Sequence, residues 1–197
     1  MKIKNITATG FLILIIILMG SFVTPAPAAE TYKLDPDHTA VIFRIKHLGV
    51  AYVYGRFSGP TGLFVLDESS PANSSIEIQV DAKNVDTAVG KRDNHLKSPD
   101  FFDAGEHPLI KFKSTSVKKS GPESYEVSGN LTLLGKTQPI TVKALQTGNG
   151  KDPWGNFRQG FETSFTIKRS DFGMDFMMGV AGDDVLLTVS VEGIRLK

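Results

Sequence analysis

A regular alternation of apolar and polar residues dominates the chain from residue 40 onward, and it restricts the fold more than any other feature. In the stretch AVIFRIKHL, Val41, Phe43 and Ile45 lie on one face of an extended chain, while Arg44 and Lys46 lie on the other. A period of two is typical of a β-strand with one buried face. The alternation therefore predicts an all-β protein whose strands share one apolar interior.

Eight segments carry this alternation, and turn signals separate most of them. The expected strands lie at residues 40–48, 55–67, 75–82, 109–117, 125–134, 139–145, 161–168 and 185–193. Strands with one apolar face form an antiparallel sandwich or a closed barrel rather than a parallel sheet.

The first thirty residues do not follow this pattern. A short basic start with Lys2 and Lys4 precedes the apolar run FLILIIILMG, and the small residues of TPAPAA come after it. This order is typical of a secretory signal peptide. We expect residues 1–28 to be removed, which leaves one domain at residues 29–197 in the periplasm. The alternative is an uncleaved membrane anchor, which the run disfavours because a spanning helix needs about 20 apolar residues.

Charge and cysteine content exclude several classes of protein. Without Lys2 and Lys4, the 22 basic residues become 20, against 21 acidic residues. The mature domain therefore has no electrostatic footprint for nucleic acid. The absence of cysteine excludes thiol catalysis, thiolate zinc sites and c-type haem attachment. A secreted domain without disulfides must also be held together by its own core.

The four histidines do not form a metal-binding pattern. A zinc site needs three or four converging ligands, and no two of these histidines have the i, i+4 spacing of a helical pair. Asp35 and His38, in the stretch DPDH, are expected to form a polar turn before the first strand. We expect neither a metal site nor a catalytic residue.

One long connection, between Asp86 and Pro108, shows no alternation. Residues 88–97 are expected to be helical, with Thr87 as the N-cap, and Pro99 ends the helix because the residue before a proline avoids helical geometry. The sequence thus predicts a short helical insertion near residues 87–103.

The stretch RDNHLKSPDFFD within this connection combines charges of both signs with two phenylalanines. Asp93 and Lys97 are four residues apart in the favourable acid-first order, so they are expected to pair. Arg92 and His95 can share a helix face. The stretch is expected to form a lid, with the phenylalanines as its apolar underside.

Five stretches resemble the successive signatures of the YceI-like family. They are YKLDPDHTAVIFRIKHLGV, GRFSGPTGLFVLD, VDTAVGKRDNHLKSPDFFDAGEHPLIKFKST, GNLTLLGKTQPITV and KRSDFGM, and the similarity covers nearly all of residues 31–197. The resemblance implies an eight-stranded, extended antiparallel β-barrel of lipocalin-like architecture. It also implies a periplasmic or secreted protein that binds a polyisoprenoid or a similar long-chain amphiphile. The G-x-W start of the true lipocalins is absent, so the kinship is one of architecture.

We therefore expect a periplasmic binding or carrier protein that holds a polyisoprenoid or an isoprenoid quinone, with no cofactor beyond this lipid. A membrane protein that exchanges lipid is a candidate partner, and a homodimer is left open. The first alternative is an enzyme that acts on an isoprenoid lipid through Arg92, Asp93 and His95. The second is a stress-response barrel with a solid core.

Strand parity and the lid together select the residues expected to line the barrel and its mouth. They are Val41, Phe43, Ile45, His47, Phe57, Phe64, Ile78, Val80, His95, Leu96, Phe101, Phe102, Ile110, Phe112, Ser114, Leu131, Leu133, Phe161, Phe165 and Val189. Polar residues on inward faces, such as His47 and Ser114, fit a cavity with a polar mouth better than a solid core, because buried polar groups need partners.

Overall fold

The computed structural model describes residues 29–197, and the expected signal peptide at residues 1–28 lies outside this part. No helix within residues 29–197 is long and apolar enough to cross a membrane. The strands are β1 (Glu30–Leu34), β2 (Ala40–His47), β3 (Ala51–Phe57), β4 (Thr61–Leu66), β5 (Ser75–Asp81), β6 (Val85–Asp86), β7 (Leu109–Gly121), β8 (Ser124–Leu133), β9 (Lys136–Lys151), β10 (Phe157–Lys168) and β11 (Ala181–Arg195). The helices of this part are α1 (Gly90–Leu96) and the short 3-10 helices η1 (Pro71–Asn73), η2 (Ala82–Asn84) and η3 (Arg169–Phe172).

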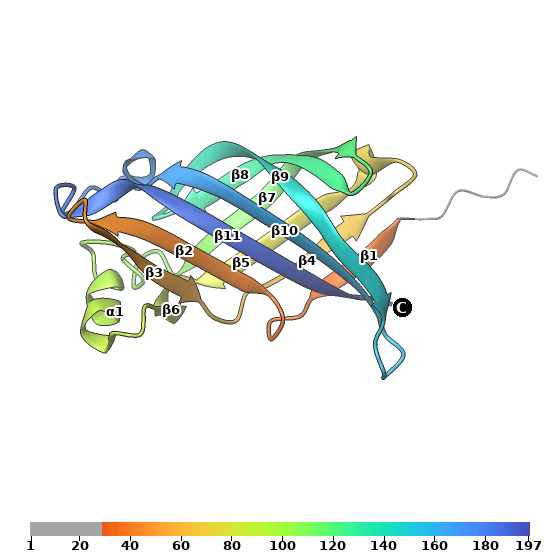
Figure 1. Ribbon diagram of the computed structural model, residues 1–197, viewed down its shortest axis with the longest axis horizontal. Coiled ribbons are helices and arrows are strands. Elements are labelled where there is room, and N and C mark those ends of the chain that lie inside the picture. The colour runs from red at the N-terminus through yellow and green to blue at the C-terminus, as the bar shows by residue number, and fades with distance from the viewer. Residues whose placement is uncertain (1–28) are drawn as a thin grey trace, which may run out of the picture.

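The strands form one closed antiparallel barrel (Figure 1). Around the ring the order is β1, β4, β5, β7, β8, β9, β10 and β11, and β11 closes the ring by pairing with β1. Three further strands continue strands of the ring after short breaks. β2 continues β1 and pairs with β11, β3 precedes β4 in line with it and pairs with β2, and β6 continues β5 and pairs with β3. The barrel therefore has eight strand positions around the ring, and we call each of them a stave. The expected fold class, an eight-stranded antiparallel β-barrel, is confirmed.

The turn at residues 35–39 lies inside the first stave rather than before it. The strand β1 precedes this turn and was not expected from the sequence, because its five residues are too few to reveal an alternation. Asp35 donates its backbone N–H to the carbonyl of Glu192 at 2.9 Å, and Thr39 Oγ1 lies 3.3 Å from the same carbonyl. The turn is thus fixed to β11, which pairs with the strands on both sides of it.

The helix α1 begins later than the sequence predicted, and the expected Thr87 cap is wrong. Val89 is the N-cap residue and makes no side-chain cap hydrogen bond. Ala88 has a φ of 61°, a left-handed conformation that turns the chain just before the helix. Thr87 instead donates its backbone N–H to Asp93 Oδ1 at 2.9 Å. Asp93 therefore accepts hydrogen bonds from Thr87 instead of pairing with Lys97.

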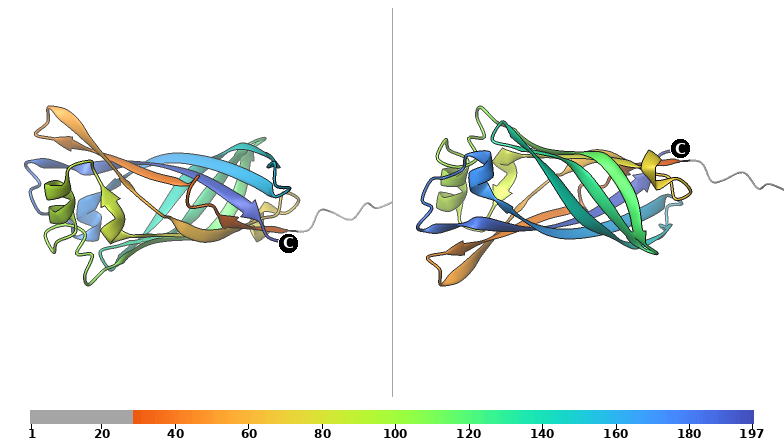
Figure 2. Two further views of the ribbon diagram at one scale, coloured as in Figure 1. Left: turned by 90° about the horizontal axis from the view of Figure 1, so that it is seen from below. Right: turned by 90° about the horizontal axis from the view of Figure 1, so that it is seen from above.

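The two ends of the barrel are built differently (Figure 2). At one end, called here the α1 end, lie α1, the hairpin between β2 and β3, and the connection from β10 to β11. The terminal end holds β1 and the C-terminus. The adjacent Phe101 and Phe102 both pack inward at the α1 end, because they lie in a turn and not in a strand. Phe102 meets Phe57 edge-on, with ring centroids 5.3 Å apart.

A glycine on β11 makes room for an aromatic stack at the terminal end. Tyr32 and Phe64 stack with ring centroids 4.7 Å apart and an interplanar angle of 9°. A Cβ atom at Gly193 would lie 2.3 Å from Phe64 Cε1 and 2.9 Å from Tyr32 Cβ. Phe64 also meets Phe161 edge-on at 5.6 Å, so its ring is held from two sides. The stack thus depends on the missing side chain of Gly193.

The substitution Gly193→Ala should therefore lower the free energy of unfolding by about 1–3 kcal/mol, the usual cost of overpacking a core. Urea unfolding followed by circular dichroism measures this value. The control is Gly105→Ala, since a Cβ atom there would meet nothing within 4 Å. Equal stabilities of the two variants would contradict the role assigned to Gly193.

Candidate functional site

The interior of the barrel contains a cavity of about 170 Å3 whose walls are almost entirely apolar. Its side-chain lining comes from the inward faces of strands on all sides of the ring. The main lining residues are Val41, Phe64, Leu66, Ile76, Ile78, Val80, Ile110, Phe112, Val117, Tyr125, Val127, Leu131, Ile140, Val142, Ala144, Phe161, Thr163, Phe165, Leu187, Val189 and Val191. The cavity can hold an apolar group without breaking a hydrogen bond of the wall.

Several apolar side chains that face the cavity are only half-buried. Phe112, Phe161 and Phe165 are examples, although all three lie on inward faces of their strands. Their remaining exposure comes from empty space beside them, since they line the cavity. An apolar cavity of about 150 Å3 is large enough for benzene. The present volume thus matches about one ring-sized group rather than a whole long-chain lipid.

Half of the residues expected from strand parity lie on this cavity. They are Val41, Phe64, Ile78, Val80, Ile110, Phe112, Leu131, Phe161, Phe165 and Val189. The others do not line it, and they are Phe43, Ile45, His47, Phe57, His95, Leu96, Phe101, Phe102, Ser114 and Leu133. Whether any of these residues contacts a ligand stays a prediction.

Most of the residues that do not line the cavity fill the α1 end of the barrel. Phe43 and Phe57 belong to one buried cluster there, and Phe101 and Leu133 belong to a second. Leu96 packs against both clusters. The α1 end is therefore plugged by side chains, and the cavity extends from the middle of the barrel toward the terminal end.

Two polar residues expected on the inner face have other roles. His47 is exposed at the last position of β2, where it pairs with Ala51 and Ala181 beyond the packed interior. Ser114 is used by the backbone, since its Oγ accepts the N–H of Ile76 at 2.9 Å. Neither residue forms the polar mouth that the sequence suggested.

The cavity also has lining residues that the selection from the sequence left out. Among them are Ile76, Val127, Ile140, Val142, Ala144, Leu187 and Val191, all on the apolar faces that the alternation identified. Tyr125 and Thr163 share these faces too. Parity was thus a sufficient signal for the face, but it does not tell at which level along the barrel a residue lies.

The wall of the barrel is incomplete between β9 and β10. Their pairing runs from Phe157 opposite Lys151 to Glu162 opposite Leu145 and stops there. Beyond this point, within the described part of the chain, β10 pairs with β11 alone and β9 with β8 alone. The two strands diverge toward the α1 end (Figure 1). We call this opening, between residues 136–144 and 163–168, the wedge.

The wedge is closed at its wide end by η3. Gln138, on β9, donates a hydrogen bond from Nε2 to the carbonyl of Asp171 at 2.9 Å. The neighbouring Arg169 is 2% exposed and donates to three carbonyls, those of Gly182, Met174 and Ala181. The Gln138 bond joins η3 to β9, and the Arg169 bonds hold η3 against the connection to β11 and the start of that strand. The cavity residues Ile140, Val142 and Ala144 lie on one border of the wedge, and Thr163 and Phe165 lie on the other.

The charged residues of the helical insertion form their hydrogen bonds with other residues of the same insertion. Arg92 donates from Nε to Thr87 Oγ1 at 2.7 Å and from a terminal nitrogen to the Thr87 carbonyl at 2.8 Å. His95 Nε2 lies 2.8 Å from Asp100 Oδ2 and meets Phe101 edge-on. These contacts hold the shape of the insertion. None of the three side chains that the alternative of an enzyme would use, Arg92, Asp93 and His95, lines the cavity.

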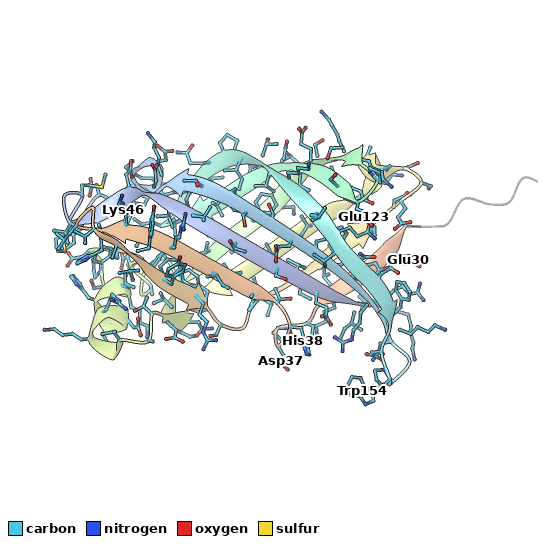
Figure 3. All side chains as sticks on the ribbon, viewed as in Figure 1. Glu30, Asp37, His38, Lys46, Glu123 and Trp154 are labelled. Carbon is cyan, nitrogen blue, oxygen red and sulfur yellow. The ribbon has the colours of Figure 1, made fainter. Side chains whose placement is uncertain are left out.

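A second polar cluster joins the turn at residues 35–39 to the hairpin between β9 and β10. Figure 3 shows His38 on the turn and Trp154 on the hairpin. Arg158 donates from one terminal nitrogen to Asp35 Oδ2 at 2.7 Å and to Glu192, and from Nε to Asp152 Oδ2 at 2.9 Å. Asp152 also accepts the backbone N–H groups of Trp154 and Asn156, so it fixes the hairpin.

Three members of this cluster have the spacing of metal ligands. Ligand atoms of Asp35, His38 and Glu192 all lie within 4.8 Å of one another. The guanidinium of Arg158 is bonded to two of these carboxylates, so it already provides the positive charge that a cation would bring. We assign the cluster a structural role.

The cluster lowers the pKa of Asp35 and of Asp152. Burial acts to raise the pKa of Asp35, but hydrogen bonds from Arg158, from His38 and from the N–H of Asp37 outweigh it and bring the pKa to about 2. Burial is likewise outweighed at Asp152, where bonds from Asn156 and Arg158 bring the pKa to about 2. The hydrogen bond to Asp35 raises the pKa of His38.

The closed barrel of eight staves and its apolar interior define a class, the lipocalin-like barrel proteins. The sequence matches the YceI-like domain over residues 32–193. A UPF0312 protein of Pseudomonas paraeruginosa is 46% identical over 169 residues, which cover 85% of this chain and 88% of that protein. A UPF0312 protein of Pectobacterium atrosepticum is 44% identical over 174 residues, with 87% and 90% covered. The chain belongs to the YceI-like family.

Solved structures share the fold. The YceI protein of Campylobacter jejuni is 29% identical with a TM-score of 0.68, covering 77% of this chain and 90% of that one. BcnA of Burkholderia cenocepacia is 23% identical with a TM-score of 0.74, covering 81% and 98%. A polyisoprenoid binding domain from Saccharophagus degradans is 13% identical with a TM-score of 0.64, covering 84% and 98%.

Removal of the Arg158 cation should cost stability mainly above pH 4. Carboxyls whose pKa is lowered from 3.8 to about 2 contribute stability above the higher value and lose it as the pH falls toward 2. The difference in unfolding free energy between the wild type and Arg158→Leu should therefore shrink from pH 6 to pH 2.5 in urea titrations. Arg56→Leu, which breaks an exposed pair with Asp86, is the control with a small effect. A difference that does not change with pH would contradict this role.

Proposed function

We propose that this protein is a periplasmic binding or carrier protein that holds a polyisoprenoid or an isoprenoid quinone inside its barrel. The observation that carries the proposal is the apolar cavity lined by the inward faces of the strands. Membership of the YceI-like family supports it, and so does the shared fold of the Saccharophagus degradans domain, which is described as binding polyisoprenoids.

The energetics favour an isoprenoid chain as the ligand. Removing one CH2-sized group from water contributes about 0.8 kcal/mol, so a five-carbon isoprene unit contributes roughly 4 kcal/mol when fully buried. Association itself costs about 4–15 kcal/mol. Several units must therefore be buried for tight binding, which is more than the present cavity accommodates. We propose that the half-buried rings of Phe112, Phe161 and Phe165 move to widen the cavity when the chain is bound.

The wedge between β9 and β10 offers a route for such a chain. The bordering stretches of β9 and β10 keep their pairing with β8 and β11 if they move apart, because they do not pair with each other. We propose that the lipid reaches the cavity sideways through the wedge after η3 releases β9. The plugged α1 end need not unpack for this step.

The two alternatives receive less support from the contacts. An enzyme that uses Arg92, Asp93 and His95 would need them beside the ligand, but Arg92 and Asp93 are bonded to Thr87, and His95 to Asp100. A stress-response barrel with a solid core would not contain the apolar cavity found here. We propose that the expected signal peptide directs the protein to the periplasm, where a membrane protein donates or accepts the lipid.

Filling the cavity should abolish lipid binding without unfolding the barrel. Protein purified from the periplasm should carry an isoprenoid lipid that native mass spectrometry and organic extraction identify. Ala144→Phe should reduce the bound fraction at least tenfold, because its ring projects into the cavity beside Tyr125. Lys143→Phe is the control, since the neighbouring residue faces outward and is exposed. Empty wild-type protein, with no affinity for isoprenoid quinones or polyprenyl phosphates, would overturn the proposed function.

Fastening the wedge should slow lipid uptake. The chain has no cysteine, so Gln138→Cys and Asp171→Cys can be joined by a short reducible linker that replaces the hydrogen bond between η3 and β9. Uptake of an isoprenoid quinone by the joined protein should be at least tenfold slower and should recover on reduction. Ser164→Cys with Thr188→Cys is the control, since these side chains face each other across β10 and β11 at 2.9 Å. Equal rates for both joined proteins would exclude the wedge as the route.

A further inference from the structure

Two hydroxyl groups on the cavity wall have no hydrogen-bond partner within residues 29–197. They are Tyr125 OH and Thr163 Oγ1, both buried, and both residues line the cavity. Tyr125 is only 2% exposed. A buried polar group without a partner costs about 1–3 kcal/mol. Such groups persist in native proteins where a ligand, an ion or a water completes them. The pair therefore marks a polar subsite in an otherwise apolar wall.

The strand register brings the two hydroxyl-bearing residues to the same level of the barrel. Tyr125, on β8, lies directly opposite Ala144 on β9. Glu162, on β10, lies opposite Leu145, so Thr163 follows at the level of Ala144. The small side chain of Ala144 leaves room between its two neighbours. The ring of Tyr125 is positioned by Phe161, which it meets edge-on at 5.9 Å.

The chemistry of the wall restricts what this subsite can bind. Lys111 and Glu162 belong to the lining, but both are exposed and alternate with the inward residues of their strands, so their charged groups do not face the cavity. The ammonium of Lys119 lies 5.7 Å from the ring centroid of Tyr125, but the negative charge of Glu68 also acts on this phenol. An anionic group such as a phosphate would therefore meet a carboxylate as well as a cation, and burying a charge without full pairing is costly. A neutral oxygen that accepts hydrogen bonds matches two hydroxyl donors.

The state of Tyr125 agrees with a donor role. Burial raises the pKa of its phenol, and the negative charge of Glu68 raises it further. The phenol therefore keeps its proton throughout the physiological range. Thr163 has no ionisable proton in this range and is a donor at every pH.

We propose that Tyr125 and Thr163 form a polar subsite that holds a neutral carbonyl oxygen of the bound lipid inside the barrel. This inference rests on the proposed function and narrows it to lipids with an uncharged, carbonyl-bearing head group, such as a quinone. The head group then lies at the level of Ala144. The isoprenoid tail runs along Val142 and Ile140, toward Phe165 and the wedge.

The test compares two ligands that differ in their oxygens. One is a ubiquinone with a short isoprenoid chain, and the other is the isoprenoid hydrocarbon squalene. Affinities are measured by partition between detergent micelles and the protein, with the bound lipid quantified by mass spectrometry. Tyr125→Phe and Thr163→Val each remove one hydroxyl with little change of shape. Each should weaken quinone binding about 2–12-fold, the loss expected for one hydrogen bond, and should leave squalene binding unchanged.

Two further measurements make the outcome decisive. The infrared carbonyl stretch of the bound quinone should lie at lower frequency in the wild type than in Tyr125→Phe, because a hydrogen bond weakens the carbonyl bond. Tyr54→Phe, which removes an exposed hydroxyl outside the barrel, should change the affinity for neither ligand. Unchanged quinone affinity in both cavity variants, or an equal loss for squalene, would overturn the subsite alone. A wild-type protein that binds neither lipid would overturn the proposed function as well.

Discussion

The closure of the ring by β11 is the constraint on which the rest of the structure depends. This strand pairs with β10 along one side, and with β1 and β2 in succession along the other. One strand can serve both because the turn at residues 35–39 interrupts the first stave and is bonded to Glu192. Arg158 then fixes the turn to the hairpin between β9 and β10. Closure removes the free edges of an open sheet, and it also creates an interior that must be filled or occupied.

The interior is filled unevenly along the barrel axis. Clusters around Phe43 and Phe101 plug the α1 end, and the stack of Tyr32 on Phe64 packs the terminal end. Between them the inward side chains pack only in part, and the cavity of about 170 Å3 remains. A solid core in a barrel of this width would require large side chains at each middle level, yet β9 places Ile140, Val142 and Ala144 there and no aromatic residue. The small side chain of Ala144 therefore contributes to the space in the interior.

The sequence predicted the faces of the strands well, because parity depends only on local geometry. It could not predict how far along the barrel axis each inward residue lies. Phe43 has the same parity as Val41, yet only Val41 reaches the cavity, since the insertion packs against the α1 end. The start of α1 also escaped prediction, because Asp93 bonds back to Thr87 and Ala88 adopts a left-handed conformation. These features depend on contacts that pairwise spacing in the sequence does not encode.

A closed barrel faces a conflict between holding a lipid and exchanging it. Full hydrogen bonding around the ring would retain the chain, but it would require a stave to unpair before the ligand could leave. The wedge that we propose as the route would resolve this conflict, because its borders are secured by β8 and β11 rather than by each other. What closes it is η3, which Gln138 bonds to β9, while Arg169 holds η3 to the connection between β10 and β11. Breaking the Gln138 bond costs about 0.5–1.5 kcal/mol, which is less than opening a strand pair that contains several such bonds. The barrier to exchange can thus be set locally, without weakening the ring that defines the fold.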